Sequence, residues 1–99
     1  MRKITGTCIK IDKFGKLHLK TDKQLDLANY KGRKPVLSNG YHFTLGKHCT
    51  MKDGDKHIGI AKLMSAIITI RFRIMPYKFT SGGKFLQGIS LKAYKIDII

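Results

Sequence analysis

Apolar and polar residues alternate with a period of two along most of the chain, whereas the period of an α-helix is hard to find. The clearest segment is residues 65–75. The apolar residues of one face are Ile68, Ile70, Phe72 and Ile74. The other face becomes basic at Arg71 and Arg73. Such alternation is typical of a half-buried β-strand, so the segment predicts a strand with an apolar inner face and a basic outer face.

Four further segments show the same alternation and also predict strands. They are residues 4–11, 16–21, 41–45 and 85–99. Residues 12–15 join the first two as a hairpin, with Gly15 available for a positive φ. A second turn centres on Asp53 and Gly54. The alternation of the last segment loses phase at residues 94–96, which predicts a bulge or a bend.

Three segments interrupt the pattern. Residues 22–32 predict a helical turn, capped at its start by Asp22 and ended by the final glycine. Residues 58–63 fit either a short strand or a turn. Pro76 either ends regular pairing or confines its strand to a sheet edge. Residues 77–84 then predict a connection with a flexible Gly-Gly tip.

These elements predict an all-β fold, a small five-stranded OB-like barrel with at most one short helix. The chain of 99 residues is long enough for one hydrophobic core, and it has no internal repeat and no linker. We therefore expect one domain over residues 1–99. Phe43 and Phe72 are assigned to its core because both are in phase with aliphatic neighbours.

The net charge of the chain indicates the kind of partner that this fold binds. Twenty Lys and Arg residues stand against six acidic residues, all Asp, and the formal net charge is +14. Self-repulsion of this size destabilises a compact domain, and a polyanion relieves it. No acidic residue lies between Asp55 and Asp97, so we expect the phosphate-binding face mainly in the C-terminal half. Nucleic acid is the first candidate partner, an anionic membrane surface is the second, and lysines that serve only solubility are the third interpretation.

Location follows from what the sequence lacks. No apolar run approaches the roughly 18 residues of a membrane-spanning helix, and the first residues lack the apolar core of a signal peptide. The two cysteines, Cys8 and Cys49, do not indicate a disulfide framework. We therefore expect an intracellular protein without a membrane partner, in the cytoplasm or nucleoid of a host cell.

Catalysis and metal binding find little support among the residues. The chain has no Glu, and four of its six Asp residues lie beside Lys or Gly and resemble turn or capping residues. The His and Cys residues lack the paired spacing of metal ligands, and the adjacent His48 and Cys49 lie on opposite faces of an extended chain. We therefore expect no enzyme, no cofactor and no metal site, with Cys8 buried in the core.

Aromatic residues interleave with cations, as single-stranded nucleic acid requires for base stacking and phosphate contacts. Tyr77, Phe79 and Phe85 flank the Gly-Gly tip, where burial is harder, and stacking and core packing both stay open for them. The candidate nucleic-acid-binding residues are Tyr30, Arg33, Lys34, Arg71, Arg73, Tyr77, Lys78, Phe79, Lys84 and Lys92. No long basic helix is present to read a major groove, which favours single strands over duplex.

Four motifs follow one another in the C-terminal part of the chain. They are residues 66–73, the run Pro76-Tyr77-Lys78-Phe79, the run Gly82-Gly83-Lys84, and residues 88–96. In this order they resemble the C-terminal part of viral and phage single-stranded DNA-binding proteins of OB-fold type. The resemblance covers about the last third of the chain. It implies a five-stranded barrel and sequence-tolerant binding to DNA exposed in replication or recombination. The residues that it implies for this binding are Arg71, Arg73, Tyr77, Phe79, Lys84 and Lys92.

We therefore expect a sequence-tolerant single-stranded DNA-binding protein that coats or protects DNA strands. Two alternatives stay open, an RNA-binding or ribosome-associated β-barrel and a basic protein that packages duplex DNA. The oligomeric state is open as well, because Ile96, Ile98 and Ile99 either close the chain's own barrel or pair with a second subunit in a homodimer or higher homo-oligomer.

Overall fold

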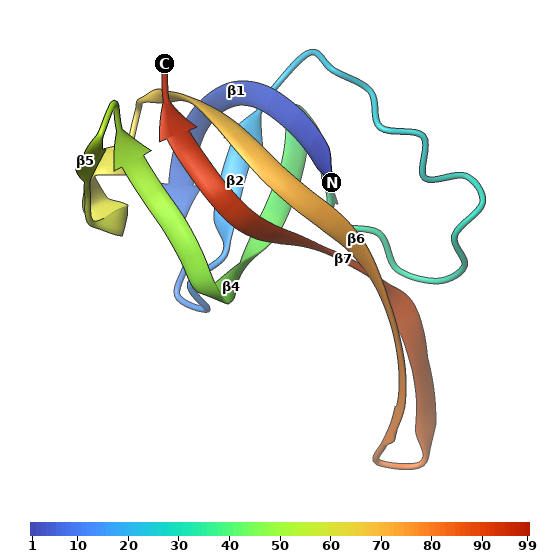
Figure 1. Ribbon diagram of the computed structural model, residues 1–99. Coiled ribbons are helices and arrows are strands. Elements are labelled where there is room, and N and C mark those ends of the chain that lie inside the picture. Colours follow the sequence, from blue (N-terminus) through green and yellow to red (C-terminus); the bar gives the residue numbers. More distant parts are fainter.

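The computed structural model describes all 99 residues and contains seven β-strands and one short 3₁₀-helix (Figure 1). The strands are β1 (Arg2–Ile11), β2 (Leu17–Lys20), β3 (Val36–Leu37), β4 (Gly40–Asp53), β5 (Lys56–His57), β6 (Ile67–Ser81) and β7 (Lys84–Ile98). The 3₁₀-helix η1 covers Ile60–Leu63. The predicted all-β class with at most one short helix is confirmed.

Five of the strands close into a barrel. β1 pairs with β2, β2 with β4, β7 with β6, and β6 with β1, all antiparallel, while β4 and β7 pair in parallel. The short strands β3 and β5 pair only with β4 and lie outside this ring. A closed five-stranded barrel of this kind is the OB-like architecture predicted from the sequence.

The apolar faces of the five strands meet inside the barrel and form one core. Phe43 of β4 and Phe72 of β6 are fully buried, and their rings meet edge to face with centroids 5.2 Å apart. Both assignments to the core are confirmed, and Cys8 is also fully buried, as expected. Apolar side chains from every barrel strand surround the two rings, and no polar or charged residue is buried among them.

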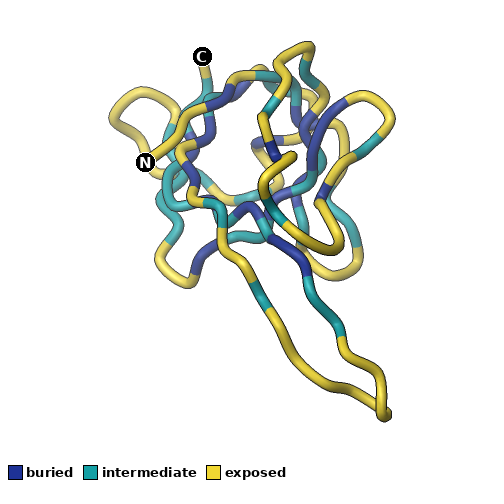
Figure 2. The backbone as a smooth tube through the Cα atoms, turned by 90° about the vertical axis from the view of Figure 1, so that its right-hand side faces the viewer, coloured by how far each residue is buried: buried dark blue, intermediate teal, exposed yellow.

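The strands β6 and β7 are longer than the barrel and continue beyond it as a two-stranded arm, residues 76–89. β6 pairs with β1 only up to Phe72, whereas its pairing with β7 continues to Ser81 and Lys84. Figure 2 shows the arm projecting from the barrel, with most of its length exposed. Only Gly82 and Gly83, with φ of 57° and 76°, form the turn at its tip, as a two-residue hairpin requires.

The arm corrects one prediction about the segment after the long strand and decides between two alternatives for Pro76. Tyr77 and Phe79 belong to β6 and not to a connection, because they pair with Gly88 and Leu86. Pro76 does not end the pairing. It lies opposite Ile89 on the edge of β6 that no other strand covers, which is the alternative that the sequence left open.

The loss of phase near residues 94–96 is a β-bulge, as predicted. Arg71 pairs with Lys95 and the next residue, Phe72, pairs with Ala93, so Tyr94 is the extra residue of β7. The bulge allows both Ala93 and Ile96 to enter the core, although they are three residues apart. It therefore keeps one long strand in register with the barrel on both sides of the irregularity.

The predicted helical turn over residues 22–32 is wrong. Only one turn-like backbone bond lies within it, from the Tyr30 N–H to the Leu27 carbonyl. Other backbone groups bond elsewhere, since the Leu25 N–H donates to the Tyr41 hydroxyl at 2.8 Å. Leu27 is buried in the core. The segment is therefore held at single residues and does not bury the continuous apolar stripe that a helix needs.

The remaining contacts show the form of residues 58–63 and the place of the last strand. Residues 58–63 form a turn, the 3₁₀-helix η1, which buries Leu63 in the core. Ile96 is fully buried and pairs with Met51 of β4 and Ile70 of β6. The last strand therefore closes the barrel of its own chain.

Candidate nucleic-acid interface

A basic groove lies where the arm leaves the barrel, and we call it the groove throughout. Its volume is about 240 Å³. It is lined by Lys16, Arg33, Lys34, Pro35, His42, Thr44, Tyr77, Ile89, Ser90 and Leu91. No carboxylate lies among these residues. A second hollow of about 240 Å³ shares Lys16, Arg33 and Tyr77 with it and adds Phe79 and Leu86, so the groove continues onto the arm.

Tyr77 forms the aromatic wall of the groove. It pairs with Gly88, and a Cβ atom at position 88 would lie 2.9 Å from the Tyr77 Cζ, so the ring lies across the glycine backbone. The Phe79 ring follows on the same face of the arm, with its centroid 5.9 Å from that of Tyr77 and its plane tilted by 34°. Phe79 is half exposed, so the two rings form a short platform open to solvent.

Arg33 is held beside the arm by backbone bonds. Its N–H donates to the Gln87 carbonyl and its carbonyl accepts from the Ile89 N–H, both at 2.9 Å. Gly32 precedes it with a φ of 85°, and any side chain there would collide with the Gln87 carbonyl. Arg33 therefore pairs with β7 like a short third strand, and it stands at a fixed place on the rim of the groove.

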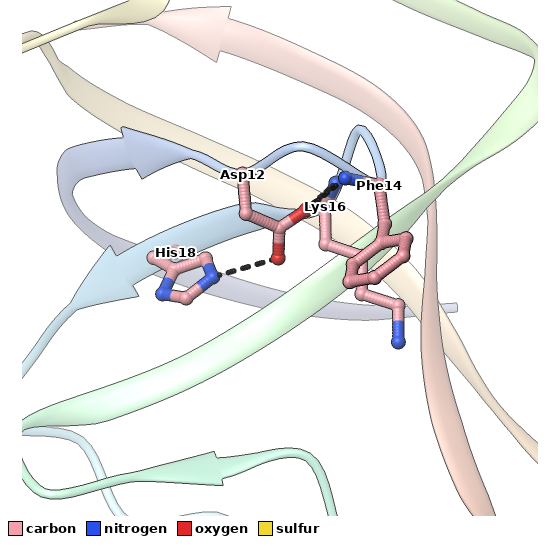
Figure 3. Close-up of polar contacts among 4 residues, drawn as sticks. All are labelled: Asp12, Phe14, Lys16 and His18. Atoms are coloured by element: carbon pink, nitrogen blue, oxygen red, sulfur yellow. Dashed lines mark hydrogen bonds and ion pairs between the residues drawn. The ribbon is translucent and has the colours of Figure 1, made fainter.

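Lys16 reaches the groove from the β1–β2 turn, which Asp12 organises (Figure 3). One oxygen of the Asp12 carboxylate accepts the N–H groups of Phe14 at 2.8 Å and Lys16 at 3.0 Å. The other oxygen lies 3.0 Å from the His18 Nε2. The hydrogen bond with His18, helped by these backbone bonds, lowers the pKa of Asp12 to about 2. The turn therefore stays ordered around an ionised carboxylate that is engaged with its own neighbours.

His42 forms part of the floor of the groove and is the cross-strand partner of His18, with ring centroids 5.9 Å apart. Burial lowers the pKa of His42, and the charges of Lys16 and His18 lower it further. The imidazole is therefore neutral at pH 7. It is available there as a hydrogen-bonding group for a base or a sugar.

A strip of cations continues from the groove along the outer face of β6 and β7. Arg73 pairs with Lys92, four residues along β6 from the pair of Tyr77 and Gly88, and an even spacing places the outward side chains on one face. The Arg73 Cζ lies 5.6 Å and the Lys92 Nζ 5.7 Å from the centroid of the Tyr94 ring. Both distances permit cation–π contacts, so the bulged tyrosine orients the two cations.

The structure brings some of the candidate residues together and separates others. Those in the groove or its extension are Arg33, Lys34, Tyr77 and Phe79. Those on the outer strip are Arg71, Arg73 and Lys92, with Lys84 near the tip of the arm. Lys78 lies on the other face of the arm and pairs with Gln87. Tyr30 and Lys78 line a further hollow, which shares Tyr77 and Ile89 with the groove.

The sequence did not identify Lys16, His42, Thr44 or Ser90 as groove residues. Lys16 lies in phase with His18, on the polar side of the predicted second strand, which was the available signal. Three cations of the groove come from the first 34 residues, because barrel closure brings the β1–β2 turn and residues 33–35 beside β7. The cations of the groove therefore come from the N-terminal half of the chain, whereas those of the outer strip come from the C-terminal half.

A larger hollow of about 360 Å³ lies between the end of β2 and residues 36–41. It includes Asp22 and its only aromatic residue is Tyr41, which is buried and whose hydroxyl already accepts the Leu25 N–H. It offers a polyanion neither an uninterrupted positive surface nor an exposed ring. The groove is therefore the better candidate site.

Comparisons of the chain with protein-family models, with characterised proteins and with solved structures find no match. No group of three or more His, Cys, Asp or Glu side chains is arranged to hold a metal ion. No helix has the length and apolar character needed to cross a membrane. The fold and its groove define the chain as an OB-like barrel with a basic, aromatic-walled cleft.

Proposed function

We propose that this chain is a sequence-tolerant single-stranded DNA-binding protein that coats or protects DNA strands. The observation that carries the proposal is the position of Tyr77, whose ring shares one carboxylate-free groove with Lys16 and Arg33. Cations along a groove neutralise phosphates, and an aromatic wall stacks on any base regardless of its identity. The arrangement therefore supports affinity without sequence preference.

The barrel supports the same proposal. In OB-folds, the face of the second and third strands and the loops around it commonly bind oligonucleotides. Here those strands are β2 and β4, which contribute His18 and His42 to one outer face, and the β1–β2 turn contributes Lys16. A fold alone does not define a function, so the chemistry of the groove carries the proposal.

Single strands fit the groove better than a duplex. The rings of Tyr77 and Phe79 stand side by side on one narrow ribbon, and stacking on them requires unstacked bases. The role in replication or recombination, and a viral or phage origin, rest on the C-terminal sequence resemblance alone.

Competition between nucleic acids tests the proposal. A labelled oligo-dT is bound first, and unlabelled oligo-dT, oligo-U and a DNA duplex of equal length then compete for the protein. The proposal expects oligo-dT to displace the label at the lowest concentration. Stronger competition by oligo-U would favour the RNA-binding alternative, and stronger competition by duplex would favour DNA packaging.

A further inference from the structure

We infer that the face of the arm opposite the groove is a second contact surface for single-stranded nucleic acid. We call it the back face, and its residues are Lys78, Phe85 and Gln87 of the arm, with Tyr30 and Lys31 of the adjacent loop. This inference rests on the proposed function of the groove. It adds a separate surface, so that one chain holds two segments of strand.

The strand register separates the two faces. Side chains alternate between the faces of a β-ribbon, and directly paired residues share a face. Tyr77, paired with Gly88, and Phe79 face the groove. Lys78, paired with Gln87, and Phe85 belong to the opposite set. The arm therefore presents one aromatic and cationic set on each side.

The back face repeats the chemistry of the groove. The Lys78 Nζ lies 5.8 Å from the centroid of the Phe85 ring, within cation–π range, and 59% of Phe85 is exposed. A hollow of about 170 Å³ at the base of the arm has no carboxylate in its lining. It shares Tyr77 and Ile89 with the groove, and its other lining residues are Tyr30, Lys31, Pro76, Lys78, Gln87 and Gly88. Tyr30 packs against the core, which fixes its ring beside this hollow.

The edges of the arm make a protein strand a poor occupant. Unpaired sheet edges attract strands of other chains, and proline blunts such an edge. Pro76 lies on the uncovered edge of β6, and Arg33 already occupies the edge of β7 at Gln87. What the arm leaves open is its exposed back face, and the positive charge of that face complements a polyanion.

The experiment counts short oligonucleotides per protein. Oligo-dT of about eight nucleotides is short enough to occupy one face, within the site sizes of about 4–16 nucleotides known for OB-folds. Native mass spectrometry and calorimetry at low salt measure how many bind. We expect two per chain, the second weaker than the first.

A double variant tests which residues hold the second oligonucleotide. Phe85→Ala with Lys31→Ala removes one ring and one cation from the back face, and we expect the second affinity to fall roughly tenfold or more while the first stays unchanged. Lys62→Ala with Met64→Ala is the matched control, because it removes one lysine and one exposed apolar residue at η1, on the side of the barrel away from the arm (Figure 1). We expect this control to keep two oligonucleotides.

The outcomes separate the two proposals. One bound oligonucleotide per wild-type chain would leave the proposed function standing and overturn the back face. No bound oligonucleotide would overturn both. A change in the oligomeric state of the Phe85 and Lys31 variant, with no change in oligonucleotide number, would assign the back face to protein association and overturn the inference.

Discussion

The ring of Tyr77 lies across the backbone of Gly88, its cross-strand partner at the base of the arm. A Cβ atom at position 88 would lie 2.7 Å from the Tyr77 Oη and 2.6 Å from the Arg33 carbonyl oxygen. Because Gly88 has no side chain, the Tyr77 ring and the backbone of Arg33 can both lie against it. The groove therefore owes the position of its aromatic wall and of one cation to this glycine.

Replacing Gly88 by alanine tests this relationship. The methyl group must displace either the Tyr77 ring or the strand-like segment at Arg33. We expect a loss of about 1–3 kcal/mol in the free energy of unfolding, as is typical of overpacking. We also expect affinity for oligo-dT to fall about tenfold, because the platform loses a wall. Denaturant unfolding and fluorescence anisotropy measure the two effects.

Gly59→Ala is the control for this substitution. Its backbone has a negative φ of −83°, and nothing lies within 4 Å of an added Cβ. The free energy of unfolding should change by no more than about 0.5 kcal/mol, and binding should not change. Equal effects of the two substitutions on binding would remove Gly88 from the account of the groove.

Removing a ring from the platform tests stacking. Tyr77→Ala and Phe79→Ala should each weaken single-strand binding by about 1–3 kcal/mol, the usual value of one base–aromatic stack. Tyr77→Phe keeps the flat ring and should retain most of the affinity. If both alanine variants bind as tightly as the wild type, the aromatic wall is not a stacking surface.

The neutral state of His42 makes stability depend on pH. Its pKa in the folded protein is lower than in the unfolded chain, where it is near the ordinary 6.5, so the unfolded state binds the proton more readily. Stability due to this group is therefore constant above about pH 6.5 and falls as the pH drops below it. His42→Gln should reduce this fall, measured by denaturant unfolding at several pH values. An unchanged fall in the variant would assign the effect to another group.

The carboxylate of Asp12 also makes stability fall as the pH drops, but over a lower pH range than His42. Its folded-state pKa of about 2 is below the ordinary 3.8, so its stabilising effect is present above the ordinary value and is lost as the pH falls toward 2. Carbon-detected NMR should give a titration midpoint of the Asp12 carboxyl near the lower value, and a midpoint near 3.8 would contradict the bond with His18.

Asp12→Ala should also weaken oligonucleotide binding, because the turn that carries Lys16 loses the carboxylate that accepts its backbone N–H.

Much of the fold could be predicted because burial imposes a period of two on the strands. The alternation of Ile68, Ile70 and Phe72 predicts the inner face of β6, and the loss of phase at Tyr94 predicts the bulge of β7. The segment from Asp22 to Gly32 could not be predicted in this way. Its residues are held one by one through distant partners such as Tyr41, and local patterns carry no information about them.

The groove could be predicted only in part for the same reason. Tyr77 and Phe79 stand out in the sequence because aromatic residues beside a Gly-Gly turn are hard to bury. Lys16 enters the groove only through barrel closure, which joins residues far apart in the sequence. Lys78, a direct neighbour of both rings in sequence, lies on the other face because adjacent residues of a strand point in opposite directions.

The salt dependence of oligo-dT binding tests the central claim most directly. Each phosphate contact releases counterions, so the logarithm of the binding constant falls linearly with the logarithm of the salt concentration. The groove and its outer strip hold six cations, which are Lys16, Arg33, Lys34, Arg71, Arg73 and Lys92. We expect a slope of about −4.2 for six contacts with a single strand. Tight binding with a slope near zero, or no binding at low salt, would contradict it.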